Sequence, residues 1–202
     1  MPPTKALLFD LGNVLIGFDL ARGYRALAPH CRCAPAEMPR LILESGLVRP
    51  FERGEISGEE FFRQLGAVLG LDVSYEKFCE LWGSIFLPEP LLTDDLLAAL
   101  RRRYRMVLLS NTNEIHYRRI ERHYSAVSHF DAHVLSCRVG AMKPSERIYK
   151  EAVLQARCEP QECFYTDDVE EFVEGARRCG IDAAVFRGAA ELERELRRRE
   201  IL

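Results

Sequence analysis

Residues 7–17 read LLFDLGNVLIG and place Asp10 directly after an apolar run, followed by a leucine, a glycine and an asparagine. A short apolar run bounded by turn residues is typical of a strand buried inside a parallel sheet. Asp10 would then stand at the carboxyl end of that strand, where open parallel sheets bind their ligands. An aspartate can also serve there only as a turn or cap residue, so its role depends on what the other strands bring to the same edge.

Four further strand-like runs follow in the second half of the chain, and each comes after a stretch with helical periodicity. They are RMVLLS (105–110), DAHVLS (131–136), CFYTD (163–167) and DAAVF (182–186). Gly180 stands where the helix before the last run should end. With KALLF (5–9) as the first strand, this alternation predicts an α/β fold: a Rossmann-like parallel sheet with helices on both faces.

Residues 18–90 interrupt the alternation and look entirely helical. Ser57 and Glu60 have the spacing of a capping box and precede a helical apolar stripe. We therefore predict a Rossmann-like core formed by residues 1–17 and 91–202, and an inserted α-helical module formed by residues 18–90.

Composition and charge limit the classes of partner. Twenty-eight lysines and arginines against 31 aspartates and glutamates give a formal net charge of -3, which disfavours nucleic acid and anionic membranes as partners. No apolar stretch approaches the ~20 residues that span a bilayer, and the N-terminus lacks a secretory pattern, so we expect a cytoplasmic protein. The seven cysteines are dispersed and odd in number, which favours reduced thiols over disulfides or a zinc site.

Polar side chains gather at the predicted strand ends. Each of them alone could be an ordinary turn, cap or loop residue. Together, three carboxylates at one edge of a sheet would repel each other unless a cation neutralised them, and oxygen ligands of this kind suit Mg²⁺. The hydroxyl, amide and ammonium groups nearby could then hold the oxygens of a phosphate. The residues are Asp10, Ser110 with Asn111, Lys143 before a proline, and Asp167 with Asp168.

The order and spacing of these segments resemble the haloacid dehalogenase superfamily of phosphohydrolases, in the subfamily with a helical cap after the first strand. The resemblance covers nearly the whole chain and is closest to small bacterial sugar-phosphate phosphatases similar to α-D-glucose-1-phosphate phosphatase. Four motifs carry it: FDLGNV (9–14), LLSNTN (108–113), MKPSERIY (142–149) and FYTDDVEEFVEGA (164–176). The resemblance implies that residues 18–90 form the cap domain.

The resemblance also implies a role for each motif residue. Asp10 would be the nucleophile that forms an aspartyl-phosphate, and Lys143 would offset its charge. The phosphoryl group would be bound by Ser110, Asn111 and Lys143. The Mg²⁺ ligands would be Asp10, the backbone carbonyl of Gly12, Asp168 directly and Asp167 through a water molecule.

Two positions depart from the family pattern. Gly12 stands where most of these phosphatases have an aspartate that acts as general acid and base, a contribution typically worth ~10² to 10⁴ in rate. Asp19 is either a substitute acid or the N-cap of a helix that starts near residue 21. Phe172 replaces a common polar residue, so a brace near Lys143 is expected to be missing, unless Glu170 or Glu171 compensates; both are also typical first-turn helix residues.

We therefore expect a Mg²⁺-dependent phosphatase that hydrolyses a small phosphorylated metabolite, a sugar phosphate, as a monomer or homodimer. The adjacent acids Asp167 and Asp168 argue against a metal-independent dehalogenase, and Gly12 argues against a phosphomutase. The alternative is a non-catalytic module of the same fold that binds phosphate, metal or another protein.

Overall fold

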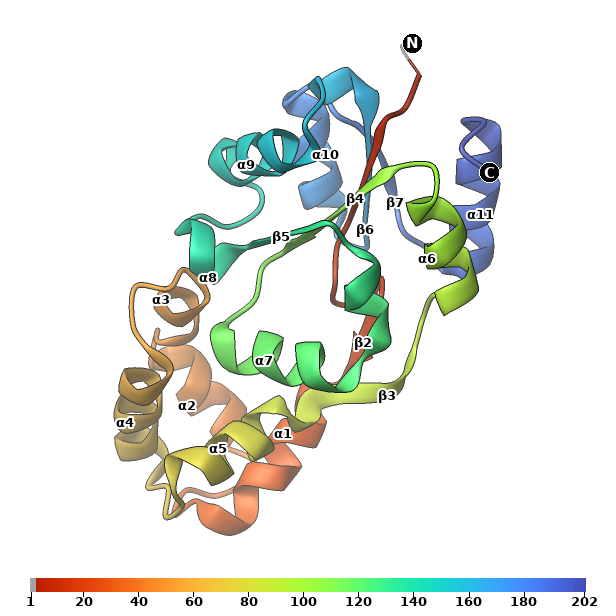
Figure 1. The fold of residues 1–202 in the computed structure, drawn as a ribbon. Helices are drawn as coiled ribbons and strands as arrows, with labels where there is room; N and C mark the ends of the chain where they lie inside the picture. The colour runs from red at the N-terminus through yellow and green to blue at the C-terminus, as the bar shows by residue number, and fades with distance from the viewer. Residues whose placement is uncertain (1–2) are drawn as a thin grey trace.

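A computed structural model describes residues 3–202, and its centre is a five-stranded parallel sheet (Figure 1). The strand order is β5-β4-β1-β6-β7. The strands are β1 (Ala6–Phe9), β4 (Arg105–Ser110), β5 (Ala132–Leu135), β6 (Cys163–Asp167) and β7 (Asp182–Val185). All four neighbouring pairs in this order are parallel, so the predicted fold class is confirmed.

Helices cover both faces of the sheet. Successive strand residues point to opposite sides, so each face carries apolar side chains that pack against helices. Leu7 and Phe9 of β1 face a cluster that includes side chains of α6 (Asp94–Arg101), α7 (Glu114–His123) and α11 (Ala189–Arg198). Ala6 and Leu8 face the opposite cluster, with side chains of α9 (Glu146–Ala156) and α10 (Glu170–Arg178). Because both faces are buried against apolar side chains, the strands read as continuous apolar runs.

Five helices between β2 and β3 lie together at one end of the molecule (Figure 1). We call residues 20–82 the helical segment. It has its own apolar cluster, rich in aromatic rings, to which α7 contributes only Ile115 among the buried members. The predicted division into a core of residues 1–17 and 91–202 and a cap of residues 18–90 stays a prediction. The helices are α1 (Leu20–Leu27), α2 (Met38–Glu44), α3 (Val48–Glu52), α4 (Gly58–Leu69) and α5 (Tyr75–Trp82).

The expectation that residues 18–90 are entirely helical is wrong at both ends. The strands β2 (Ile16–Phe18) and β3 (Phe86–Pro90) pair antiparallel, with Phe18 opposite Phe86. Each strand supplies the backbone hydrogen bonds that the other needs, although they lie far apart in the chain. The prolines of β3 also disfavour a helix there.

Short elements complete the chain. They are α8 (Ser136–Val139) and the 3-10 turns η1 (Ala28–His30), η2 (Gly83–Ile85), η3 (Ser125–His129) and η4 (Pro160–Glu162). All seven cysteines are free thiols in the structure. Within residues 3–202, no helix has both the length and the apolar character needed to cross a membrane.

The helix caps expected from the sequence are found only in part. The Ser57 hydroxyl caps α4 by accepting a hydrogen bond from the Glu60 amide at 3.1 Å. The Glu60 carboxylate binds Arg63 at 2.6 Å instead of returning to the cap, so half of the predicted capping box forms. Ser145 stands at the N-cap of α9 but its side chain makes no cap hydrogen bond. Gly180 follows α10 with φ +82°, as its predicted stop position requires.

Candidate active site

The polar ends of three neighbouring strands meet at one edge of the sheet. Asp10 follows β1, Ser110 ends β4 and Asp167 ends β6, and β1 lies between the other two strands. The Asp10 side chain is nearly buried and Asp167 is completely buried. Asp10, Asp167 and Asp168 each offer a carboxylate oxygen, and these three atoms lie within 4.8 Å of one another. We call these carboxylates, with Lys143, the strand-end cluster.

Lys143 holds the strand-end cluster together. Its Nζ atom donates to Asp10 Oδ1 at 2.7 Å, to Asp167 Oδ2 at 2.6 Å and to the Leu109 carbonyl at 3.2 Å. The Asn111 side chain fixes the main chain of the same lysine: it accepts from the Lys143 amide at 2.8 Å and donates to its carbonyl at 3.1 Å. The Asn111 amide is therefore engaged in positioning Lys143, and its predicted contact with substrate stays a prediction.

Burial dominates the electrostatics of the cluster. Burial raises the pKa of Asp10 to about 7; Lys143 opposes this rise and Asp167 adds to it. Burial also works against the charge on Lys143, but the Asp10 and Asp167 carboxylates outweigh it and raise the pKa of the ammonium. For Asp168, burial raises the pKa and the hydrogen bond from Asn13 opposes the rise. Three carboxylates against one ammonium leave the cluster with an excess of negative charge.

The chemistry of the donors fits a divalent ion such as Mg²⁺. The converging side-chain donors are carboxylate oxygens, which hard cations prefer. No backbone amide within residues 3–202 donates to the Gly12 carbonyl, so that oxygen is also available. The predicted metal ligands Asp10, Gly12, Asp167 and Asp168 thus lie in the loops at one sheet edge, and their role as ligands stays a prediction.

Three residues to which the sequence analysis assigned no role in the site orient the acidic pair. The Tyr165 hydroxyl donates to Asp167 Oδ2, and the Val169 amide donates to Asp167 Oδ1 at 2.8 Å. Asn13 Nδ2 donates to Asp168 Oδ2 at 3.2 Å, from a backbone with φ +54° that asparagine tolerates better than most residues. The signal for Tyr165 was available, since it precedes Asp167 by two residues on a strand and so shares its face.

Phe18 fills the space beside Gly12. A Cβ atom added at Gly12 would lie 2.9 Å from Cε1 of the Phe18 ring, closer than carbon atoms pack. An acidic side chain at this position therefore requires the ring to move. The family pattern has an acidic side chain at this position. In this structure the Phe18 ring lies in the space where that side chain would begin.

Asp19 is a helix cap, as one of the two readings predicted. Its carboxylate accepts from the Ala21 amide at 2.9 Å at the start of α1 and pairs with Arg25 at 3.3 Å on the surface. Glu170 and Glu171 are exposed first-turn residues of α10, which confirms the simpler interpretation of both.

The Phe172 ring contacts the ammonium of Lys143. The centroid of its ring lies 5.0 Å from Lys143 Nζ, within the range of a cation–π contact. Position 172 offers no polar brace, as expected, and the ammonium is contacted by this ring and by the Asp10 and Asp167 carboxylates.

A cavity of about 270 Å³ lies between the helical segment and the loop after β4. It begins at Phe18 and reaches Asn113 and His116 of the core. Its walls are mostly apolar. Within residues 3–202, the Glu52 carboxylate on this wall makes no ion pair or hydrogen bond, and Arg49 is the positive charge that acts on it. The Trp82 Nε1 atom has no acceptor and is itself inaccessible to water. The remaining lining residues are Leu20, Gly23, Tyr24, Ile42, Val48 and Ile85.

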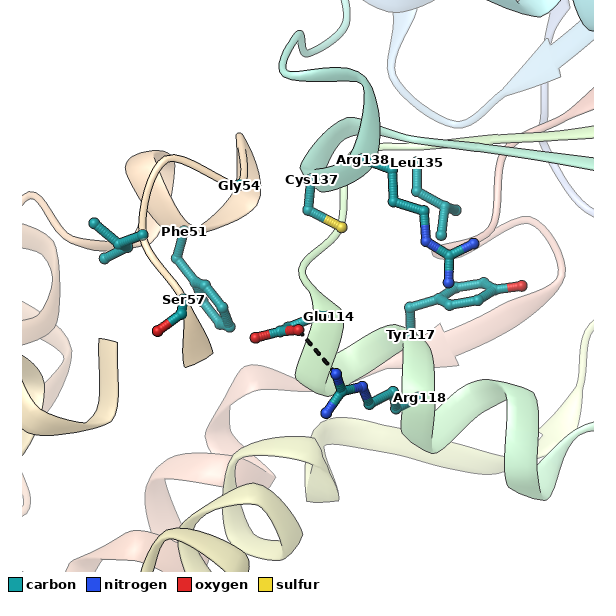
Figure 2. A pocket seen from close by; sticks show the side chains of 10 residues that line it. Phe51, Gly54, Ser57, Glu114, Tyr117, Arg118, Leu135, Cys137 and Arg138 are labelled. Atoms are coloured by element: carbon teal, nitrogen blue, oxygen red, sulfur yellow. Dashed lines mark hydrogen bonds and ion pairs between the residues drawn. The ribbon is translucent and has the colours of Figure 1, made fainter. Parts of the chain in front are cut away.

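A second cavity of about 340 Å³ lies farther along the same boundary (Figure 2). Gly54 and Ser57 form one side, and α7 and α8 form the other. Figure 2 shows the Glu114 carboxylate paired with Arg118, and the Arg138 guanidinium beside the Tyr117 ring. None of the strand-end carboxylates lines either cavity, and Phe18 of the first cavity lies beside Gly12.

Comparison with known proteins agrees with the geometry. The haloacid dehalogenase-like hydrolase family matches residues 4–180. D-ribitol-5-phosphate phosphatase of Bacteroides thetaiotaomicron is 24% identical over 198 residues, which cover 95% of this chain and 96% of that protein.

Solved structures of similar proteins have the same fold. A family enzyme from Bacteroides thetaiotaomicron, crystallised with magnesium and inorganic phosphate, has a TM-score of 0.80 and 29% identity over 92% of this chain and 96% of its own. A HAD-like family hydrolase from Porphyromonas gingivalis has a TM-score of 0.78 and 27% identity over 96% of this chain and 98% of its own. The chain therefore belongs to the haloacid dehalogenase-like hydrolases.

Proposed function

We propose that this hydrolase is a Mg²⁺-dependent phosphatase that releases phosphate from a small phosphorylated metabolite, a sugar phosphate, through Asp10. The observation that carries the proposal is the buried ammonium of Lys143, which binds Asp10 at 2.7 Å and Asp167 at 2.6 Å. This contact fixes one carboxylate oxygen of Asp10 at the edge of the sheet. The similarity to a magnesium-bound and phosphate-bound family enzyme supports the same assignment.

Mg²⁺ would be held by Asp10, Asp168, the Gly12 carbonyl and, through water, Asp167. When bound, the ion neutralises the excess negative charge and polarises a phosphate oxygen. The chain prepares this site by orienting Asp168 from Asn13 and Asp167 from Tyr165 and the Val169 amide.

Asp10 would attack the phosphorus atom with one carboxylate oxygen, while the bond from phosphorus to the leaving oxygen breaks with its electron pair. The resulting aspartyl-phosphate is then cleaved by water, which restores the carboxylate and releases inorganic phosphate. Lys143 would stabilise the transferring group together with the Ser110 hydroxyl. Asn111 would contribute by keeping Lys143 in place.

The ring of Phe18 beside Gly12 limits how the leaving oxygen is protonated. No side chain at position 12 can supply the proton, so the proton must come from water or the leaving group must be stable as an anion. An anomeric sugar phosphate or an acyl phosphate meets this requirement better than a simple alkyl phosphate.

The organic part of the substrate would lie in the cavity that begins at Phe18. Glu52 lines this cavity, and its carboxylate can accept a hydrogen bond there. A ligand with several hydroxyl groups can donate to it. A relative that acts on D-ribitol-5-phosphate supports the choice of a polyhydroxylated substrate.

The second candidate is a non-catalytic module that binds phosphate or metal, and Gly12 with Phe18 above it is the observation that favours it. Phosphate release from sugar, acyl and aryl phosphates, measured with and without Mg²⁺, separates the two. We expect wild-type turnover that depends on Mg²⁺ and is abolished in Asp10→Asn, with Asp19→Asn as the matched surface control. No turnover on any of these substrates would support the binding module.

A further inference from the structure

Ser136 lies where the helical segment meets the loop after β4. It is the first residue of α8 and is completely buried. Its hydroxyl oxygen accepts a hydrogen bond from the Thr112 amide at 2.9 Å. The same oxygen lies 2.6 Å from the carbonyl of Glu52 and 2.9 Å from the carbonyl of Thr112. One side chain therefore contacts both the end of α3 and the loop that carries Ser110.

A serine hydroxyl has a single proton to donate. It can satisfy the Glu52 carbonyl or the Thr112 carbonyl, but not both at once. The shorter distance assigns the proton to Glu52 while α3 is in contact with α8. If α3 moves away, the same proton can turn to the Thr112 carbonyl, so the hydroxyl has a partner in either arrangement.

We propose that Ser136 is a positioning residue that couples docking of the helical segment to the geometry of the loop 110–113. This inference rests on the proposed function, in which that loop contributes to phosphate binding. Thr112 is the direct neighbour of Asn111, whose side chain makes two hydrogen bonds to the main chain of Lys143. A change in the partner of Ser136 thus reaches the catalytic ammonium through two adjacent residues.

The backbone around Ser136 makes the docking specific. Gly54 has φ +68°, and a Cβ atom added to it would lie 2.1 Å from the Cys137 carbonyl oxygen. Only glycine permits this approach, because both the conformation and the space exclude a side chain. Figure 2 shows Gly54 and Cys137 on opposite sides of the boundary, and the Gly58 amide donates to Glu114 at 2.7 Å nearby.

The single tryptophan of the chain reports on the same boundary. The Trp82 indole, at the end of α5, stacks on the His116 imidazole of α7 with ring centroids 5.7 Å apart and an angle of 11° between the planes. Separation of the helical segment from the core would expose this ring. Quenching of its fluorescence by acrylamide therefore measures docking independently of catalysis.

The test compares the wild type with Ser136→Ala and Gly54→Ala. Ser128→Ala is the matched control, because the Ser128 hydroxyl donates only to the Ser125 carbonyl on the surface, at 2.7 Å. Acrylamide quenching of Trp82 is measured before and after addition of Mg²⁺ and inorganic phosphate, and circular dichroism checks the fold. We expect these ligands to reduce quenching in the wild type and the control.

In Ser136→Ala and Gly54→Ala the ligand-dependent change in quenching should shrink by roughly threefold or more. For Ser136→Ala, kcat with p-nitrophenyl phosphate should fall roughly tenfold while KM changes less than about twofold, because the loop is misplaced rather than the phosphate site lost. A merely structural role would lower the stability and leave both the ligand response and kcat per folded molecule unchanged.

A folded Ser136→Ala protein with the wild-type quenching response and wild-type kcat overturns the proposal, and so does a wild type in which Trp82 does not respond to the ligands. If Ser136→Ala fails to fold, the ligand-dependent quenching of Gly54→Ala provides the test. This variant disturbs the docking while the Ser136 hydroxyl remains, and a wild-type quenching response in it would overturn the proposal. Absence of phosphate release from every substrate would refute the proposed function, whereas the quenching comparison would still decide the coupling.

Discussion

The strand-end cluster and the boundary between the helical segment and the core are both buried, yet different forces hold them. In the strand-end cluster, one ammonium bridges Asp10 and Asp167, and each charge depends on its partners because isolated buried charges are costly. At the boundary, Trp82 stacks on His116. Hydrogen bonds of the Ser136 hydroxyl, and one from the Gly58 amide to Glu114, add to this packing. The first region should therefore respond to changes of charge, and the second to packing and to proton uptake.

The largest effect is expected from Lys143→Met. Removal of the ammonium leaves Asp10 and Asp167 buried without a counter-charge, which should lower the free energy of unfolding by about 3 to 5 kcal/mol in metal-free buffer. Urea denaturation measures this loss. Addition of Mg²⁺ should recover part of it, because the ion supplies positive charge to the same carboxylates.

Lys150→Met is the matched control, since Lys150 pairs with Glu146 on the exposed face of α9. Exposed pairs contribute about 0 to 1 kcal/mol. Equal losses in the two variants would show that the strand-end cluster is not held together by charge.

The boundary should respond to pH through His116. Burial lowers the pKa of its imidazole from 6.5 to about 4, and Nε2 lies 3.2 Å from the Trp82 carbonyl. Between these two values the unfolded chain binds a proton that the folded protein does not, so the stability falls as the pH falls through this window. The wild type should lose on the order of 2 kcal/mol more than His116→Gln between about pH 7 and about pH 4.5.

Urea denaturation at the two pH values measures this difference. His123→Gln serves as the control, because His123 lies at the exposed end of α7 and its ring bonds only to the Arg119 carbonyl. Parallel pH profiles of the wild type and His116→Gln would contradict the assignment of the imidazole to the docked boundary.

The smallest effect is expected where the two regions touch, at Gly12 and Phe18. Gly12→Asp should cost about 1 to 2 kcal/mol of stability, because the new side chain overlaps the Phe18 ring. Phe18→Ala should relieve the overlap, so that the double variant is more stable than the sum of the single changes by roughly 1 kcal/mol. Strictly additive losses would show that the ring does not occupy the space beside Gly12.

The sheet could be predicted from the sequence because its strands are buried on both faces. RMVLLS and CFYTD match β4 and β6 residue for residue, since a short apolar run between two helical stretches strongly favours a buried parallel strand. The β2 and β3 strands were missed because each is short and finds its partner across the whole helical segment. The local sequence of neither strand indicates that the two strands pair.

The candidate site could be predicted as far as it lies on strand ends. Asp10, Ser110 and Asp167 are where the sequence placed them, because parallel strands end at the same edge. Phe18 could not be assigned to the space beside Gly12, since its position depends on the unpredicted pairing of β2 with β3. The role of Ser136 also depends on tertiary contacts, because its hydroxyl bonds to residues 24 and 84 positions away.

Burial should make Lys143 the least reactive of the four lysines of the chain toward reagents that acylate amines. Only 1% of its side chain is accessible, and its raised pKa keeps the amine protonated and non-nucleophilic. Lys5, Lys77 and Lys150 are largely exposed. Amine-acylating reagents should therefore modify those three first, and the delayed appearance of acylated Lys143 in a mass spectrum would serve as a footprint of an intact strand-end cluster.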